Sequence, residues 1–228
     1  MKKIKILSLV AVSFLLYSCA PTASLTKEQA YASLYSERPL TIAIMPPINH
    51  TNNVDAKEYF YSTLTQPLCE RGYYVIPPFL AMEMFKSESA YDSELFINNS
   101  TEQFGKVLGA DVVLFTTITQ WEKAALAAKV YVTVEYLMKS TKTNEIIFQR
   151  KGKIAYDTSV NSGGGGLLGA LIDMAASAIT AAATDHIKVA RACNAYTLFD
   201  VPAGKYNPQY DTDQTLTAGP KEFTQTVR

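Results

Sequence analysis

The apolar residues of this chain form continuous runs in its first half and alternate with polar residues further on. The run at residues 41–45 is apolar on both faces, which is typical of a strand in the middle of a covered sheet, and the prolines at 46–47 end it. The segments YYVIPP at 73–78 and DVVLFTTITQW at 111–121 predict a second and a third strand.

Two later segments alternate between apolar and polar residues, as strands with one exposed face do. In residues 129–139 the apolar face carries Val130, Val132, Val134, Tyr136 and Met138. In residues 145–157 it carries Ile146, Phe148, Ile154 and Tyr156. The polar link at 140–144 is short, so the two strands are expected to form an antiparallel hairpin.

Between the first three predicted strands, apolar residues recur at the spacing of a helix. Residues 54–71 place Phe60, Leu64 and Leu68 four positions apart, with Gly72 as the C-terminal stop. Pro67 is expected to kink this helix or to divide it into two short helices. The segments 79–88 and 100–110 predict two further short helices.

Four consecutive glycines at 163–166 precede an alanine-rich stretch, which leaves three alternatives open. A phosphate-binding loop would need a lysine where the chain has leucines, and a membrane span would have to bury Asp173. The third alternative, a long packing helix over 167–199, agrees with one stripe of mostly small or apolar residues spaced by three and four. Small residues in that stripe would let a sheet, another helix or another copy of the molecule come close, and the candidates for partner or dimer contacts are Leu168, Ile172 and Ile179. The alternative to the packing helix is a partner-binding or oligomer-forming loop.

The predicted order of elements is β-α-β-α-α-β-β-β-α, which gives an α/β fold. We expect a mixed sheet of about five strands with packed helices, including the long C-terminal helix. Residues 39–210 would form this single domain, since the chain of 228 residues is 48% hydrophobic and needs no second core. Residues 211–228 are polar and are expected to form a disordered tail.

The first 18 residues have the features of a secretory signal peptide. A basic head precedes an apolar run over residues 6–16, which is shorter than the roughly 20 residues that span a bilayer. The sequence LYSC at 16–19 resembles the bacterial lipoprotein cleavage box, in which the cysteine becomes the first mature residue and is acylated. We therefore expect acyl and diacylglycerol groups on Cys19 and no other cofactor; the alternative is ordinary cleavage without a lipid.

Residues 19–38 are expected to serve as lipid anchor and flexible tether, because residues 20–38 are polar, small and aperiodic. A flexible coil of this length would span roughly 24 Å on average and about 60 Å when fully extended. The folded domain would then stay near the membrane that holds the lipid, with no other segment apolar and long enough to cross it.

Charge excludes some partners. The chain has 21 basic and 21 acidic residues, and removal of the three lysines in the signal peptide leaves a slight acidic excess. Such a balance attracts neither nucleic acid nor an anionic membrane surface. Two cysteines remain besides the anchor, Cys69 and Cys193; buried free thiols are favoured over a disulfide because both lie among apolar neighbours on predicted helices.

The sequence contains few residues suited to catalysis. His186 lies in the apolar stripe of the predicted long helix, where a hydrogen-bonded core histidine is favoured over a ligand, and His50 follows the first strand. Asp185 and His186 are adjacent on that helix, which does not suit a catalytic relay. No metal-binding or nucleophile motif is present. We therefore expect a protein that is not an enzyme, with no catalytic, cofactor-binding or metal-binding residues.

An ordered set of short segments resembles the bacterial outer-membrane lipoprotein family typified by a meningococcal vaccine-candidate antigen. The resemblance covers nearly the whole mature chain. It rests on Cys19 and on the segments IAIMPP (42–47), QPLCERGYYVIP (66–77), GADVVLF (109–115), LLGA (167–170) and VPAGKYNPQY (201–210). The four-glycine run and the polar tail depart from the family pattern.

The resemblance implies a fold similar to the N-terminal domain of TolB and to the periplasmic domain of the curli secretion channel lipoprotein. It also implies binding to envelope proteins, for example a curli-channel-like lipoprotein, and allows a homodimer. We expect an accessory or assembly subunit of an outer-membrane transport or secretion complex. The alternative is a regulator of a peptidoglycan synthase. The protein is expected in the outer membrane, attached only by its lipid, with the domain facing the periplasm.

Overall fold

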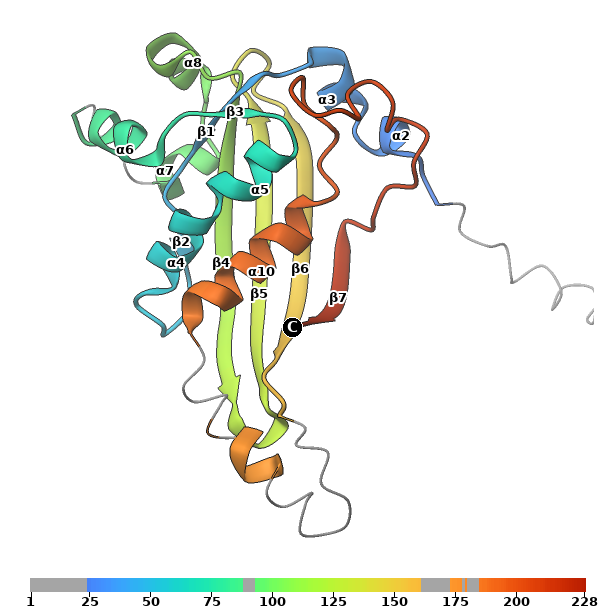
Figure 1. Ribbon diagram of the computed structural model, residues 1–228. Coiled ribbons are helices and arrows are strands. Elements are labelled where there is room, and N and C mark those ends of the chain that lie inside the picture. The colour runs from blue at the N-terminus through green and yellow to red at the C-terminus, as the bar shows by residue number, and fades with distance from the viewer. Residues whose placement is uncertain (1–23, 88–92, 161–172, 178, 180–184) are drawn as a thin grey trace, which may run out of the picture.

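A computed structural model describes residues 24–87, 93–160, 173–177, 179 and 185–228. Seven strands form one mixed sheet in the order β3-β1-β4-β5-β6-β7, and β2 also pairs with β4 (Figure 1). The bounds of the strands are β1 Thr41–Ile44, β2 Ile48–Asn49, β3 Tyr74–Val75, β4 Val112–Ala124, β5 Lys129–Ser140, β6 Ile146–Asp157 and β7 Glu222–Val227. The predicted mixed α/β fold is confirmed, with β2 and β7 in addition to the predicted strands.

Strand direction follows the sequence patterns. The predicted hairpin of β5 and β6 is antiparallel, and β4 pairs antiparallel with β5. The short strands β1, β2 and β3 run parallel to their neighbours. The alternation in β5 places its apolar face in the core, since Val130, Val132, Val134, Tyr136 and Met138 are all buried.

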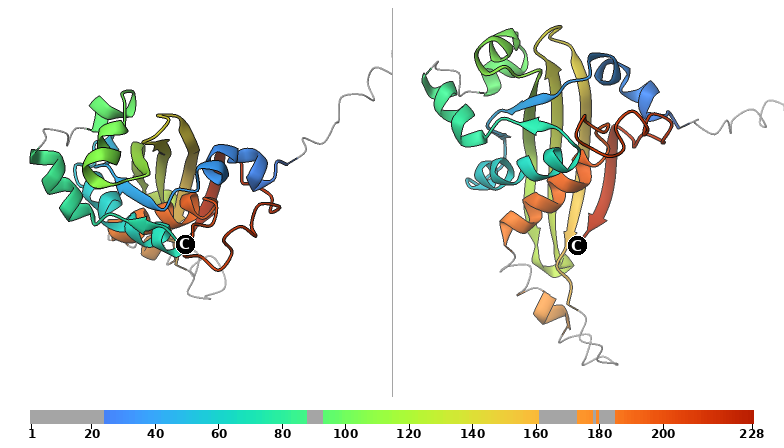
Figure 2. Two further views of the ribbon diagram at one scale, coloured as in Figure 1. Left: turned by 90° about the horizontal axis from the view of Figure 1, so that it is seen from above. Right: turned by 45° about the horizontal axis from the view of Figure 1, so that its top comes forward.

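Helices cover the two faces of the sheet (Figure 2). One face packs against α4 Ala56–Thr63, α5 Thr65–Glu70 and α10 His186–Leu198. The other face, near β1, packs against α6 Pro78–Ser87, α7 Ser93–Ile97 and α8 Glu102–Leu108. Strand β1 is buried on both sides, because Ile42 and Ile44 belong to the first core and Ala43 to the second.

The helix predicted over 54–71 is divided, as Pro67 suggested. The break falls between α4 and α5, and Pro67 lies in the first turn of α5, where a missing N–H removes no intrahelical hydrogen bond. Gly72 follows α5 with φ of +85°, a left-handed conformation that favours glycine.

The long helix predicted over 167–199 is wrong as a continuous element. Helix α10 begins at His186, because Asp185 has an extended backbone and its side chain accepts a hydrogen bond from the Ile187 N–H (3.0 Å). A separate helical stretch covers 173–177. The glycine run lies outside the described residues.

Both ends of the expected domain extend further than the sequence indicated. Helices α2 Lys27–Ala30 and α3 Ala32–Glu37 replace half of the expected anchor and tether at 19–38, and Thr26 with Gln29 forms a capping box at the start of α2. At the other end, β7 pairs in parallel with β6, so the expectation of a disordered tail is wrong for residues 222–227. In the part of the chain that the structure describes, no helix is long and apolar enough to cross a membrane.

Candidate functional site

Helix α10 is fixed to the sheet by one buried asparagine. The Asn194 side chain donates to the Thr63 hydroxyl (2.8 Å) and the Phe60 carbonyl (3.1 Å) of α4, and it accepts a hydrogen bond from the Tyr136 hydroxyl of β5. Because these groups are buried, the network specifies where α10 lies. Burial also raises the pKa of the Tyr136 phenol well above its ordinary value.

The N-terminal helices and the C-terminal segment meet at a buried carboxylate, Asp213. Its Oδ2 atom lies 3.1 Å from Arg71 Nη2 and 3.6 Å from Lys27 Nζ. Its oxygens also accept hydrogen bonds from the Tyr35 hydroxyl (2.8 Å) and the Ala203 N–H (2.8 Å). Burial lowers the pKa of Lys27, and the nearby Arg71 guanidinium lowers it further. Asp213 therefore offsets two buried cations from distant parts of the chain.

A second buried acid, Asp200, joins the same two segments. Its Oδ2 atom accepts hydrogen bonds from the Tyr31 hydroxyl and from the Gly219 N–H (3.0 Å). The C-terminal segment is further fixed to the start of α2, since the Lys27 N–H donates to the Leu216 carbonyl (2.8 Å). Residues 213–219 are thus held in place although they form no strand with the sheet.

A cavity of about 750 Å³ opens between α10 and this C-terminal segment. We name it the α10 cavity; its walls are Arg150, Ala192, Ala195, Tyr196, Phe199, Asp200, Thr217, Ala218, Gly219, Val227 and Arg228. Its volume lies within the range of roughly 300–1,000 Å³ that is usual for small-molecule sites. The α10 cavity is mostly apolar, with a few charged groups in its walls.

Arg150 is the buried charge of the α10 cavity. Its side chain extends from β6 and donates to the Thr197 carbonyl (2.9 Å) and the Pro220 carbonyl (3.3 Å). The guanidinium also lies over the Phe223 ring, 4.4 Å from its centre. Gly219 allows the C-terminal segment to approach, because a Cβ atom there would lie 2.4 Å from Arg150 Nη2.

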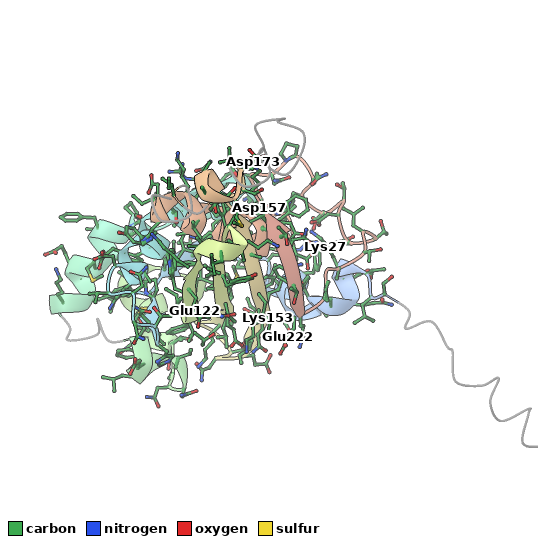
Figure 3. The ribbon with its side chains drawn as sticks, turned by 90° about the horizontal axis from the view of Figure 1, so that it is seen from below. Lys27, Glu122, Lys153, Asp157, Asp173 and Glu222 are labelled. Carbon is green, nitrogen blue, oxygen red and sulfur yellow. The ribbon has the colours of Figure 1, made fainter. Side chains whose placement is uncertain are left out.

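A second candidate surface lies at the β3 edge of the sheet, where β3 has no strand on its outer side among the described elements. The exposed fractions there are 55% for Tyr74, 80% for Phe79 and 53% for Leu80. These three residues fall within seven positions, at the junction of β3 and α6. In contrast, Glu122, Lys153 and Glu222 place charged side chains on the sheet face opposite α10 (Figure 3).

The structure describes one of the four residues for which the sequence predicted a lipid or a partner contact. Cys19, Leu168 and Ile172 lie outside the described residues, so their proposed roles stay predictions. Ile179 is 70% exposed, which is compatible with a contact residue. Ile179 is not among the residues that line the α10 cavity.

His186 is packed among aromatic rings near the N-terminus of α10. Its ring centre lies 5.3 Å from those of Tyr59 and Trp121, and its Nδ1 atom lies 3.4 Å from Asn53 Nδ2. Burial lowers the pKa of His186, and Lys123 lowers it further. The prediction of a hydrogen-bonded histidine holds at Nδ1 alone, because Nε2 is buried with no hydrogen-bond partner in the described structure.

The two cysteines differ in environment, and both thiols are free. Cys193 is buried, as predicted, and burial raises the pKa of its thiol. Cys69 is exposed, so the prediction of burial is wrong for this residue, which faces outward on α5. In the described ranges no three His, Cys, Asp or Glu side chains are grouped as a metal ion would require, and His50 is exposed.

The sequence contained at most weak indications of the α10 cavity and of the exposed residues at the β3 edge. Arg150 occupies an inward position of an alternating strand, between the core residues Phe148 and Ile154. A charged residue at such a position indicates a buried polar site. The exposure of Phe79 had no sequence signal, since an aromatic residue at the start of a helix is equally compatible with the core.

The family model described as "Putative lipoprotein GNA1162-like" matches residues 29–204. The lipoprotein NMB1124/NMB1162 of Neisseria meningitidis serogroup B is 25% identical over 162 residues, which are 68% of this chain and 73% of that protein. The crystal structure of lipoprotein GNA1162 from Neisseria meningitidis has 22% identity and a TM-score of 0.47, and covers 62% of this chain and 98% of its own.

A PelC dodecamer from Paraburkholderia phytofirmans has 14% identity and a TM-score of 0.39, with 71% of this chain and 87% of its own covered. The family match and the meningococcal relative agree with the resemblance inferred from the sequence. The matched residues include α10 and every strand except β7. Strand β7 and the wall of the α10 cavity formed by residues 217–219 lie beyond the matched range.

Proposed function

This chain belongs to the GNA1162-like family of lipoproteins, and from that premise we propose that it is a lipid-anchored envelope protein that acts by binding other proteins. Cys19 would carry the lipid. The domain would face the periplasm from the outer membrane, as an accessory or assembly subunit of a transport or secretion complex. The observation that carries this proposal is the exposed surface of Tyr74, Phe79 and Leu80 at the β3 edge.

That edge has two properties of a protein-binding surface. A strand at the end of a sheet presents unpaired backbone N–H and C=O groups, to which an extended segment of a partner can add. Exposed aromatic residues next to it supply apolar contact area, and aromatic residues are enriched at protein interfaces. Binding is therefore supported by both backbone and side chains at one place.

The position of the anchor restricts where the partner can be. Leu25, which is hydrogen-bonded to the domain, follows Cys19 by six positions. Six residues span at most roughly 20 Å, so a lipid on Cys19 would hold the domain closer to the membrane than the expected tether of about 60 Å. A partner in or near the same membrane is favoured over a peptidoglycan synthase on the far side of the cell wall.

The test is photocrosslinking in cells. A photoreactive phenylalanine analogue replaces Phe79 in the tagged chain, and the crosslinked proteins are identified by mass spectrometry. The matched control carries the analogue at Leu126, which is 91% exposed in the β4–β5 turn. We expect an outer-membrane transport or secretion component to be enriched at Phe79 relative to Leu126.

Two other outcomes would change the proposal. Enrichment of a peptidoglycan synthase at Phe79 would replace the accessory subunit with the regulator as the proposed function. Identical crosslinked proteins at Phe79 and Leu126 would contradict the β3 edge as the partner surface.

A further inference from the structure

We propose that the α10 cavity is a binding site for a single-chain fatty acid, whose alkyl chain lies along α10 and whose carboxylate faces Arg150. The site is separate from the β3 edge and does not depend on the function proposed above. It is inferred from the walls of the cavity, the charge within it and its position on the molecule.

The walls suit an alkyl chain. Helix α10 and its C-cap contribute Ala192, Ala195, Tyr196 and Phe199, the segment 213–219 contributes Ala218, and β7 contributes Val227. Phe199 is 72% exposed, so the ligand-free protein leaves a large apolar ring in water beside the cavity. An alkyl chain placed here would remove apolar surface from water at roughly 25 cal/mol per Å².

The charge of Arg150 selects an anionic ligand. The residue is only 6% exposed, yet no described carboxylate oxygen lies within 4.0 Å of its guanidinium. Backbone carbonyls satisfy several of its N–H groups but do not neutralise its charge. A buried cation without a counter-ion is costly, so an anion that enters the cavity is stabilised.

The one acid among the lining residues of the cavity does not remove this preference. Asp200 lines the same cavity, but its Oδ2 atom is engaged by Tyr31 and Gly219. Arg228 also lines the cavity, but the residue is exposed and its guanidinium donates to the Ser159 carbonyl (2.9 Å), so Arg150 is the buried cation that an anion would meet. The acyl groups of a lipoprotein anchor are bound as esters or amides and carry no carboxylate, so this charge favours a free fatty acid over the lipid on Cys19.

The location of the cavity places it near a source of fatty acids. Ala218 in its wall donates a backbone hydrogen bond to the Leu25 carbonyl (2.9 Å), where the chain leads toward Cys19. If Cys19 is the anchor, as proposed above, the cavity lies close to the bilayer surface. The walls and the charge of the cavity support fatty-acid binding independently of the anchor.

Photolabelling tests the site directly. The purified full chain, in a buffer containing phospholipid nanodiscs, is irradiated with a diazirine-bearing long-chain fatty acid and digested with trypsin. We expect the label on the peptide of residues 192–205, which holds the α10 side of the cavity. The corresponding fatty alcohol should label this peptide about tenfold less, because it cannot form a charged hydrogen bond with Arg150.

A matched pair of variants fills the cavity or leaves it open. Ala195→Trp places a large ring in the cavity and should reduce the labelling about tenfold, whereas Ala127→Trp, at an exposed position in the β4–β5 turn, should leave it within twofold. Equal labelling by acid and alcohol would overturn the proposal, as would equal labelling of both variants.

A third comparison distinguishes a free fatty acid from the lipid on Cys19 as the ligand of the cavity. The same experiment is run on the Cys19→Ala chain, which lacks the proposed anchor. Equal labelling of this chain and the lipidated chain supports a free fatty acid as the ligand. Labelling of the Cys19→Ala chain alone would mean that the lipid on Cys19 fills the cavity, and would contradict the proposal.

Discussion

The Leu25 carbonyl accepts a hydrogen bond from the Ala218 N–H, with 2.9 Å between the two atoms. An isolated bridge between Thr26 and Thr217 continues this contact. Segments almost 200 positions apart are therefore joined directly where the chain leads toward Cys19.

Asp213→Asn is expected to destabilise the protein by about 3–5 kcal/mol. Lys27 and Arg71 would stay buried after the change, without the carboxylate that offsets their charges. Urea unfolding followed by circular dichroism measures the free energy of unfolding.

The matched control is Asp211→Asn, in which the lost carboxylate pairs with an exposed arginine. Arg38 and Asp211 lie 3.4 Å apart with side chains 59% and 37% exposed, so this change should cost less than about 1 kcal/mol. Equal losses for the two variants would show that Asp213 does not join the two segments as described.

Gly72→Ala is expected to destabilise the protein more than Gly109→Ala. Both glycines have positive φ, +85° and +68°, so each alanine variant should lose about 1 kcal/mol from backbone strain. At Gly72 the new Cβ would also lie 2.3 Å from the Asn207 nitrogen, whereas nothing lies within 4 Å at Gly109. Overpacking should add roughly 1–3 kcal/mol at Gly72, measured by the same urea unfolding.

Stability should fall as pH falls through the titration of His186. Burial and Lys123 lower the pKa of His186 in the folded state, so between that pKa and about 6.5 the unfolded state binds more protons. The free energy of unfolding therefore decreases as pH decreases through this range. Asp55 and Asp185 oppose the shift without reversing it.

The variant His186→Gln measures this contribution. Between pH 7.5 and 5.5 the decrease in Tm should be smaller in His186→Gln than in the unmodified protein, because glutamine does not titrate in this range. His50→Gln removes an exposed histidine and should leave the decrease unchanged. A larger decrease in His186→Gln would contradict the sign of the shift.

The core of this fold was predictable because burial leaves a pattern in the sequence. The apolar run around Ile42 identified a strand covered on both faces, and the alternation from Val130 to Met138 identified the buried face of β5. In each case the order of apolar and polar side chains along the strand shows which face is buried. The parallel pairing of the first strands depends on contacts between distant residues, which periodicity does not specify.

The sequence did not predict that the two ends belong to the domain, because backbone hydrogen bonds and buried ion pairs attach them to it. Strand β7 has only Phe223 and Val227 as apolar residues, and it is attached to β6 by a ladder of backbone hydrogen bonds. Lys27 is a charged residue in a polar stretch, and its burial depends on Asp213, which lies far along the chain. Helix α10 was predicted too long because the stripe of small and apolar residues continues through Asp185, where a cap starts a new helix.

The central claim is that a lipid on Cys19 holds this domain at a membrane, where it binds its partner. The most direct measurement is metabolic labelling with an alkyne-bearing fatty acid in cells that produce either the unmodified chain or Cys19→Ala, followed by membrane fractionation. The account predicts that the unmodified chain is labelled and found with the outer membrane, and that Cys19→Ala is unlabelled. Equal labelling of the two chains would contradict it.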